Sequence, residues 1–164
     1  ENWKRPQSEK SYLFNLIKKY FEKEISNLQE QGIKINILGD IKKLPTSLKK
    51  ILNKTITITK KNNKIIVNLA INYGAKNEIL EAVKKTKKRF NIKKIEKNLY
   101  TKNLPNPEIL IRTGGFQRLS NFLLWQLAYS ELFFLKKLWP DFNSKDLLSI
   151  IKKYKKIKRN YGKI

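Results

Sequence analysis

Residues 107–142 constrain the fold of this chain more than any other stretch. The apolar run 109–111 has the character of a buried strand, and it ends in Arg112 and a Thr-Gly-Gly turn. Arg118 and Ser120 come next, followed by a strongly apolar segment that we predict to be a helix. Glycines let the backbone approach an anion, a helix start offers free N–H groups, and arginine presents a planar fork that matches phosphate oxygens. The stretch therefore predicts a diphosphate-binding site.

Arginine is rare in this chain, which makes two arginines in one turn informative. The sequence has five arginines against a large excess of lysine, and Arg112 and Arg118 both fall in this turn. A chain that uses lysine wherever any cation suffices keeps arginine where bidentate geometry is needed, because an ammonium group acts as a point charge. The alternative interpretation is a pair of ordinary surface arginines, since a short motif is weak evidence by itself.

Three motifs in the sequence resemble the signature of the cis-prenyltransferases, the undecaprenyl diphosphate synthase family. In that family an Ile-Arg-Thr-Gly-Gly turn leads into Arg-Leu-Ser-Asn-Phe-Leu-Leu-Trp-Gln and Ala-Tyr-Ser-Glu-Leu-Phe-Phe, as residues 111–134 do here. Glu-Asn-Trp-Lys-Arg-Pro at residues 1–6 and Asn-Tyr-Gly-Ala-Lys at residues 72–76 agree with two further family motifs. Their order and spacing are family-like, so the resemblance covers essentially the whole chain.

The resemblance implies a fold and an activity. The implied fold is α/β, an open and mostly parallel sheet flanked by helices, with a hydrophobic tunnel that houses the growing prenyl tail. The implied enzyme condenses isopentenyl diphosphate onto an allylic diphosphate such as farnesyl diphosphate, and makes a long polyprenyl diphosphate carrier for cell-wall or glycan assembly. It also implies a cytoplasmic homodimer whose interface is built around residues 132–134 and the helix expected before them, with Trp125, Phe133 and Phe134 supplying apolar surface.

Family roles carry over to this chain only at matching positions. In the long C-terminal motif, the resemblance assigns Arg112, Arg118 and Ser120 to the diphosphate of isopentenyl diphosphate. It assigns Glu131 to the binding of Mg²⁺. The residues themselves favour the same kind of ion, because the chain has no Cys and no His, so any metal must be a hard cation held by oxygen.

The N-terminal motif supplies the remaining candidate site residues. By resemblance, Asn2 is a catalytic residue beside the reacting carbons, Arg5 lies near the allylic diphosphate, and Trp3 packs beside the substrate. In the family, the segment before this motif carries the first strand, a phosphate-binding turn and an essential Asp that holds Mg²⁺. Residue 1 is not Met and lies inside the motif. We therefore expect residues 1–164 to be a single domain that lacks that strand and turn and is inactive alone.

Three positions depart from the family pattern. Phe116 stands where the family usually has Glu, which removes a carboxylate from beside the diphosphate and metal site. Lys76 replaces the usual Arg after the Asn-Tyr-Gly motif, and Asn160 takes the place of an Arg near the end. Phe116 is the departure that favours a second interpretation, a non-catalytic partner subunit of the same fold. Retention of the candidate site residues argues against that interpretation, namely Arg112, Arg118, Ser120 and Glu131.

The formal net charge of +24 is compatible with binding to nucleic acid, with binding to an anionic membrane surface, or simply with an AT-rich coding sequence. The lysines are spread along segments that also carry apolar residues at helical spacing, which is typical of solvated faces of amphipathic helices. No recognised nucleic-acid motif accompanies the charge, so we expect no specific nucleic-acid binding, and a salt-sensitive gel shift with random DNA would test this. Peripheral association with an anionic membrane is favoured, since each lysine near such a surface contributes about 1 kcal/mol. No run of about 18 apolar residues is present to span a bilayer.

Apolar periodicity predicts strands alternating with helices along the whole chain. The Thr-Ile-Thr-Ile-Thr run at 55–59 is typical of a strand, but the resemblance favours a continued helix, which is our prediction. We expect Ser8 to cap the first helix and Thr46 or Ser47 to cap the second. The resemblance implies that the first helix forms one wall of the tunnel. The expected helices are 8–31, 46–60, 76–89, 92–100, 121–129 and 144–158, and the expected strands are 33–38, 64–71, 108–111 and 132–134.

The predicted strand 64–71 is almost continuously apolar, which is expected of a strand buried on both faces of a parallel sheet. It delivers an Asn-Tyr-Gly turn at its carboxyl end, where ligands collect in open α/β sheets. By resemblance, Ile65 lies at the tunnel floor, where its bulk would help to set product length. The alternative is that Ile65 is an ordinary core residue.

Overall fold

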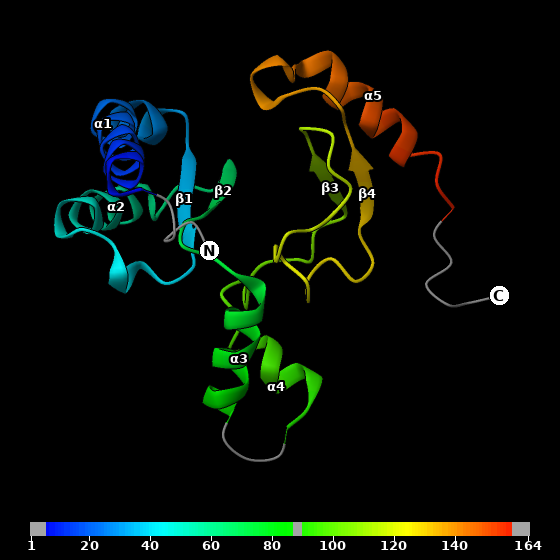
Figure 1. Ribbon diagram of the computed structural model, residues 1–164, viewed down its shortest axis with the longest axis horizontal. Helices are drawn as coiled ribbons and strands as arrows, with labels where there is room; N and C mark the ends of the chain where they lie inside the picture. Colours follow the sequence, from blue (N-terminus) through cyan, green and yellow to red (C-terminus); the bar gives the residue numbers. More distant parts are fainter. Residues whose placement is uncertain (1–5, 87–89, 159–164) are drawn as a thin grey trace. The chain divides into compact units, whose positions relative to one another are not determined.

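The computed structural model describes residues 6–86 and 90–158 (Figure 1). By their contacts these residues divide into two compact units, the first running to Glu78 and the second beginning at Ile79. Each unit holds one sheet of two parallel strands. The predicted fold class, α/β with parallel strands flanked by helices, is confirmed. The prediction that residues 1–164 form a single domain stays a prediction.

The first unit packs two helices on one side of its sheet. β1 (Ile33–Leu38) pairs in parallel with β2 (Ile65–Ala70), each residue of one strand facing one residue of the other. Figure 1 shows α1 (Gln7–Glu30) and α2 (Thr46–Thr59) together on the β1 side of this pair. A short 3-10 helix, η2 (Ile41–Lys43), connects β1 to α2.

The core of the first unit forms where α1, α2 and β1 meet. Each element contributes side chains at its own period, about 3.6 residues for the helices and 2 for the strand. Phe21 of α1 and Ile35 of β1 are buried in one cluster with Leu48, Ile51 and Leu52 of α2. The amphipathic patterns recognised in the sequence therefore converge on a single apolar cluster.

The β-branched run in α2 is helical, as predicted, because its hydroxyl groups are satisfied within the fold. Thr55 Oγ1 donates to the Ile51 carbonyl at 2.9 Å, and Thr59 Oγ1 donates to the Thr55 carbonyl at 2.8 Å. Thr59 Oγ1 also accepts from the backbone N–H of Ile35 at 3.1 Å, which ties the end of α2 to β1. Both threonines are fully buried, and their polar atoms cost little because each has a partner.

The predicted helix caps are wrong. Ser8 lies inside α1, whose N-cap is Pro6, and α2 begins after Pro45, so neither Thr46 nor Ser47 is its cap. Neither helix start has a capping side-chain hydrogen bond. Both prolines already have φ in the range that proline favours, and each carbonyl accepts the first helical hydrogen bond. Here a proline positions the helix start and replaces the expected hydroxyl.

The prediction that β2 is buried on both faces is wrong. Its first residue, Ile65, is 54% exposed, and Ile66 beside it is also exposed. The reason is that helices cover one side of this two-stranded sheet, so the outer residues of β2 lack a covering layer within the unit. Ile65 is therefore not an ordinary core residue, and its role at a tunnel floor stays a prediction.

A cleft of about 490 Å³ lies between the first turns of α1 and α2 in this unit. Its lining mixes apolar side chains, such as Phe14 and Leu48, with the polar side chains of Gln7, Ser11 and Asn15. This lining is more polar than a channel for a prenyl tail requires. The predicted hydrophobic tunnel, with α1 as one wall, therefore stays a prediction.

The second unit carries a parallel strand pair and three helices, of which the first begins in the last residues of the first unit. The two strands are short and pair through their whole length. The last two of these helices end earlier than the sequence predicted, and the first of the two is little more than one turn long. The elements are α3 (Ala75–Thr86), α4 (Ile92–Glu96), β3 (Ile109–Arg112), β4 (Glu131–Phe134), the 3-10 helix η3 (Trp139–Asp141) and α5 (Ser144–Tyr154).

The helix predicted at residues 121–129 is wrong, because the structure has a succession of turns there. Ser120, Asn121 and Leu123 have φ of 48°, 60° and 45°, which is the left-handed region. An L-residue in that region interrupts a right-handed helix. The turn after β3 therefore does not lead into a helix N-terminus, and that part of the argument for anion binding fails.

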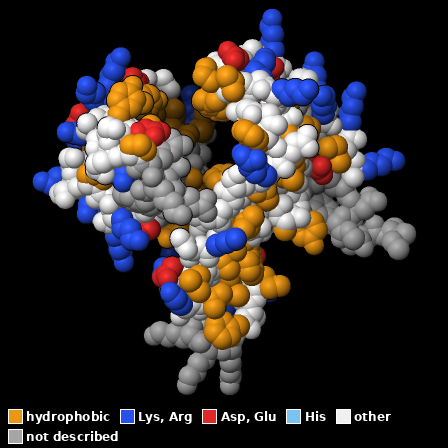
Figure 2. Space-filling view, in the orientation of Figure 1, with side chains coloured by type: hydrophobic (Ala, Val, Ile, Leu, Met, Phe, Trp, Pro, Cys, Tyr) orange, Lys and Arg blue, Asp and Glu red, His pale blue; other side chains and the backbone are white. Residues whose placement is uncertain are grey.

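The surface is rich in lysine on both units. Figure 2 shows Lys and Arg side chains spread over the elements in view, with apolar side chains between them. Within residues 6–86 and 90–158, no helix combines the length and the apolar character that crossing a bilayer requires.

Burial of Leu52 predicts a large stability loss when the side chain is truncated. Leu52 is 0% exposed at the contact of α2 with α1 and β1, so Leu52→Ala leaves a cavity. We expect the free energy of unfolding to fall by about 2–5 kcal/mol, measured by chemical denaturation. Leu16→Ala on the exposed face of α1, where Leu16 is 52% exposed, is the matched control and should change it by less than about 0.5 kcal/mol. Equal losses in the two variants would contradict this packing.

Candidate functional site

The turn that follows β3 is held by backbone hydrogen bonds to the segment that follows β4. The Leu135 N–H donates to the Arg112 carbonyl at 2.8 Å, which extends the parallel ladder by one step. The Gly115 N–H then donates to the Leu135 carbonyl and the Gly114 N–H to the Lys137 carbonyl, both at 2.8 Å. These bonds place the Thr-Gly-Gly turn at the carboxyl end of the strand pair.

The two glycines are required by conformation and not by space. Gly114 and Gly115 have φ of 90° and 79°, which side-chain-bearing residues rarely adopt. A Cβ on Gly114 would meet nothing within 4 Å, and one on Gly115 would only just reach Lys136. The glycines therefore let the chain reverse direction immediately after Arg112.

The structure brings Arg112, Arg118 and Ser120 together in one turn. Nη1 of Arg112 donates to Ser120 Oγ at 3.0 Å and also to the backbone carbonyl of Arg118. Arg112 is half-buried, whereas Arg118 and Ser120 are exposed. The Arg112 side chain therefore organises the turn, and the exposed groups of the other two residues face solvent. The proximity of the three residues is a structural fact, and their role at a diphosphate stays a prediction.

Phe116 lies near both guanidinium groups of the turn. Its ring centroid is 4.2 Å from Cζ of Arg118 and 5.9 Å from Cζ of Arg112. Both distances are within the range of a cation–π interaction, and the first is the closer and stronger one. The sequence analysis treated Phe116 only as the loss of a carboxylate, and it missed this contact.

An ion pair joins α5 to the segment after β4 that accepts the hydrogen bonds of the turn. Lys137 Nζ lies 2.8 Å from both carboxylate oxygens of Asp146. Asp146 also accepts from the Asn143 N–H at 2.9 Å, while Asn143 Oδ1 accepts from the Asp146 N–H, which forms a capping box at the start of α5. The hydrogen bonds from Lys137 and then from the Asn143 backbone lower the pKa of Asp146. This cap was not predicted from the sequence, although Asn-x-x-Asp before an apolar helix is a variant of the capping-box signal Ser/Thr-x-x-Glu/Gln.

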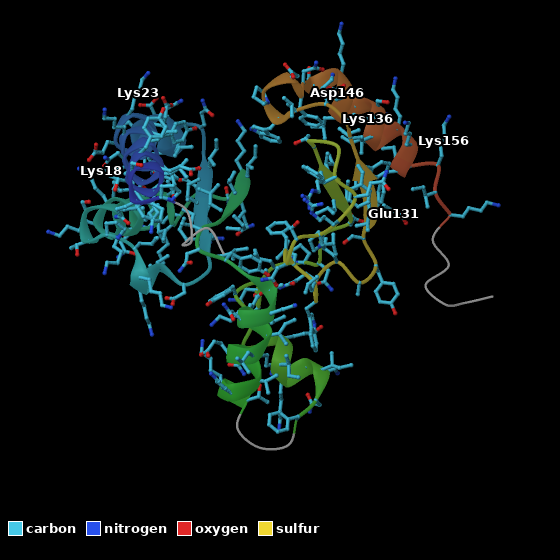
Figure 3. The ribbon with its side chains drawn as sticks, in the orientation of Figure 1. Lys18, Lys23, Glu131, Lys136, Asp146 and Lys156 are labelled. Carbon is cyan, nitrogen blue, oxygen red and sulfur yellow. The ribbon has the colours of Figure 1, made fainter. Side chains whose placement is uncertain are left out.

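Glu131, the predicted Mg²⁺ ligand, lies at the other end of the strand pair. It faces Ile109, whereas Arg112 faces Phe134, so the backbones of Glu131 and Arg112 are about 10 Å apart along the sheet. Figure 3 shows Glu131 near the start of β4, whereas Lys136 lies near α5, the helix that carries Asp146. The structure therefore does not bring Glu131 to the level of the arginine turn.

A second acid precedes β3 at the same end. The Glu131 N–H donates to the Glu108 carbonyl at 2.9 Å, and the Glu108 carboxylate accepts from the Tyr154 hydroxyl at 2.9 Å. Carboxylate oxygens suit Mg²⁺. Across the described ranges, however, no group of three or more acidic side chains is arranged to hold a metal ion. These residues alone do not make an Mg²⁺ site, so we derive no chemical step through the ion.

Asn2, Trp3 and Arg5 lie outside the described residues, as does Asn160. The Asn-Tyr-Gly turn is described, at the carboxyl end of β2 in the first unit. Asn72 Nδ2 donates to the Asp40 carbonyl at 2.6 Å, and the Tyr73 hydroxyl donates to Glu78 Oε2 at 2.5 Å. Glu78 is only 2% exposed, and the sequence analysis overlooked it. An acid in the first turn of a helix that directly follows such a turn is the signal that could have identified it.

Comparison with known proteins covers almost the whole chain. A family model described as putative undecaprenyl diphosphate synthase matches residues 1–162. An isoprenyl transferase of Rickettsia prowazekii is 44% identical over 167 residues, which cover 99% of this chain and 74% of the relative. An isoprenyl transferase of Clostridium tetani is 40% identical over 172 residues, covering 99% of this chain and 68% of that relative.

Solved structures show the same similarity. A probable undecaprenyl diphosphate synthase from Campylobacter jejuni superposes with a TM-score of 0.90 at 32% identity, covering 99% of this chain and 78% of that one. A lavandulyl diphosphate synthase from Lavandula x intermedia, in complex with dimethylallyl diphosphate, gives a TM-score of 0.93 at 31% identity. It covers 99% of this chain and 75% of the other.

The lowered pKa of Asp146 predicts a pH-dependent contribution to stability. A carboxyl group with a lower pKa in the folded protein stabilises the fold above its unfolded-state value and loses this effect as the pH falls through the folded-state pKa. For Asp146 the loss should therefore occur below pH 3.8. We expect Asp146→Asn to lower the Tm at pH 6 and to have a smaller effect near pH 3.

A double-mutant cycle identifies the cause. Lys137→Gln combined with Asp146→Asn should show a coupling at pH 6 that shrinks below pH 3.8, since the pair loses one charge. A difference in Tm that is the same at both pH values would contradict the ion-pair explanation.

Proposed function

We propose that this chain, which belongs to the undecaprenyl diphosphate synthase family of prenyltransferases, condenses isopentenyl diphosphate onto an allylic prenyl diphosphate. The observation that carries the proposal is the turn that groups Arg112, Arg118 and Ser120 at the carboxyl end of a parallel strand pair. Farnesyl diphosphate is the proposed primer, and a long cis-polyprenyl diphosphate carrier for cell-wall or glycan assembly is the proposed product.

The turn has the chemistry that an isoprenoid diphosphate requires. A diphosphate offers several anionic oxygens, and guanidinium groups bind such oxygens through paired N–H donors. Arg118 and Ser120 are exposed and supply donors, while Arg112 holds the turn and adds its charge. We propose that these three residues bind the diphosphate of isopentenyl diphosphate.

In the proposed reaction the C–O bond between the allylic carbon and its diphosphate breaks, and the bonding electrons leave with the diphosphate. The double bond of isopentenyl diphosphate attacks the allylic carbon, and loss of a proton restores a double bond with cis geometry. The products are the lengthened prenyl diphosphate, inorganic diphosphate and a proton. Cationic groups assist because negative charge builds on the departing diphosphate. No nucleophilic side chain is needed, which agrees with a chain that lacks Cys and His.

The remaining site residues are proposed from the family resemblance. Asn2 would act beside the reacting carbons, with Arg5 at the allylic diphosphate and Trp3 against the substrate. Mg²⁺ is the proposed cofactor, with Glu131 as one ligand, and when bound the ion would neutralise charge on a diphosphate. We further propose, from the same resemblance, that residues 1–164 alone are inactive.

Exposed apolar side chains support a homodimer formed by the second unit. Leu132 of β4 is exposed, as are Tyr129 just before it and the stretch Leu138–Trp139 beyond the strand. Trp125, Phe133 and Phe134, at the proposed interface, are half-buried within the unit. The spread of lysine over the surface also supports peripheral association of a cytoplasmic protein with an anionic membrane (Figure 2).

A partner subunit without catalysis of its own is the second candidate function. The separation of Glu131 from the arginine turn favours it. Such a subunit would keep the fold and the dimer surface while a second chain supplied catalysis. It predicts dimerisation without turnover.

Substitution of Arg112 by lysine tests the proposed function. The assay measures incorporation of labelled isopentenyl diphosphate onto farnesyl diphosphate, with the part of the R. prowazekii relative outside the match fused to this chain. Arg112→Lys keeps the charge but loses the bond network to Ser120 and Arg118, so we expect kcat/KM to fall at least about tenfold. Arg89→Lys, outside the three motifs, is the matched control and should retain activity.

The outcomes separate the two candidate functions. Full activity of Arg112→Lys would contradict the proposed role of Arg112. A fusion that sediments as a dimer and yet incorporates no label would favour the partner subunit. A fusion that sediments only as a monomer would count against the proposed dimer surface.

A further inference from the structure

Phe116 is an exposed aromatic side chain whose described contacts are with charged groups. It is 53% exposed, so burial in the core does not explain its position on the turn. Its ring lies against the guanidinium group of Arg118, with Cζ 4.2 Å from the ring centroid, and more distantly against that of Arg112. An exposed phenylalanine held in this way by arginines requires an explanation other than packing.

The two arginines of the turn are positioned by different means. Arg112 donates hydrogen bonds through Nη1 to a hydroxyl and to a backbone carbonyl. In the described part of the chain, no group accepts a hydrogen bond from the guanidinium of Arg118, and its close contact is the face of the Phe116 ring. The ring therefore replaces the hydrogen bonds that position the other arginine.

Contact with a ring face leaves the useful part of a guanidinium group accessible. The five N–H donors of arginine lie in the plane of the group, whereas an aromatic ring covers one face of that plane. A carboxylate in the place of Phe116 would instead occupy the donors and offset the positive charge. Phe116 thus limits the motion of Arg118 while its donors and its charge remain available to an anion.

We propose that Phe116 is a positioning residue that holds Arg118 ready for the diphosphate group of an isoprenoid substrate. The proposal rests on the proposed function, since it concerns the same diphosphate site. According to this proposal, Phe116 in place of the usual Glu strengthens anion binding and does not indicate a loss of function. It also predicts that the affinity for a diphosphate depends on an aromatic ring at this position.

Arginine side-chain NMR tests the contact without any substrate. The chain has five arginines, so arginine-specific labelling gives few signals. Protons of a side chain that lies over an aromatic ring resonate upfield of their usual positions. We expect such a shift for Arg118, its loss in Phe116→Leu, and its retention in Phe116→Tyr. Absence of the shift in the unsubstituted chain would overturn the proposal.

Titration with inorganic diphosphate tests the consequence of the contact. A cation–π interaction at an exposed site predicts a Kd about two- to fivefold higher in Phe116→Leu and a Kd close to the original in Phe116→Tyr. Phe116→Glu should weaken binding further, because it adds a negative charge beside the ligand. Phe90→Leu is the matched control, since Phe90 is 60% exposed and lies outside the turn, and should leave the Kd unchanged.

The outcomes distinguish the positioning role of Phe116 from the proposed diphosphate site. An unchanged Kd in Phe116→Leu, with the Arg118 shift lost, would overturn the positioning role and leave the proposed function standing. Failure of the unsubstituted chain to bind diphosphate would overturn the proposed diphosphate site and the positioning role with it. Weaker binding in Phe116→Leu, restored in Phe116→Tyr, supports both.

Discussion

The parallel pairing of β3 with β4 continues beyond both strands, and the candidate site depends on that continuation. Backbone hydrogen bonds of 2.8 Å join Leu135 to Arg112, Gly115 to Leu135 and Gly114 to Lys137. Because these bonds use backbone groups only, they hold the turn without any side chain, provided that positions 114 and 115 are glycine. The other side chains of the turn are therefore not needed to hold its backbone, and two of them, Arg112 and Arg118, place guanidinium groups at the end of β3.

The first unit uses the same device at the end of β1 and β2. The Ile71 N–H donates to the Leu38 carbonyl at 3.0 Å, and the Asp40 N–H donates to the Asn72 carbonyl at 3.2 Å. Gly39 lies between them, where a Cβ would come within 2.2 Å of the Ile71 carbonyl oxygen. In both units the carboxyl ends of parallel strands are tied together and lead into irregular turns, which is where ligands bind in open α/β sheets.

The sequence predicted the elements whose apolar pattern and packing agree, and failed where the backbone departs from the conformation that the apolar pattern favours. The strand β1 and the helix through Thr59 were predicted, because apolar period and buried position coincide there. Residues 121–129 have a strongly apolar pattern but form turns, since Ser120 and Asn121 adopt left-handed backbone conformations. The bond from Arg112 to Ser120 lies at the start of that segment. No local pattern of apolar residues reveals such a contact.

The long C-terminal motif predicted that Arg112, Arg118 and Ser120 lie close together, but it did not predict the different contacts that each of them makes. Arg112 is engaged within the turn, and Arg118 is held by a ring that the motif comparison treated as a loss. The segment 112–120 contains two arginines and no acidic residue, so its positive charges repel each other in the free protein. Hydrogen bonds from Arg112 and the Phe116 ring offset part of this repulsion, and a bound diphosphate would offset more of it. The proposed affinity of the turn for a diphosphate therefore follows from the charge that its folding brings together.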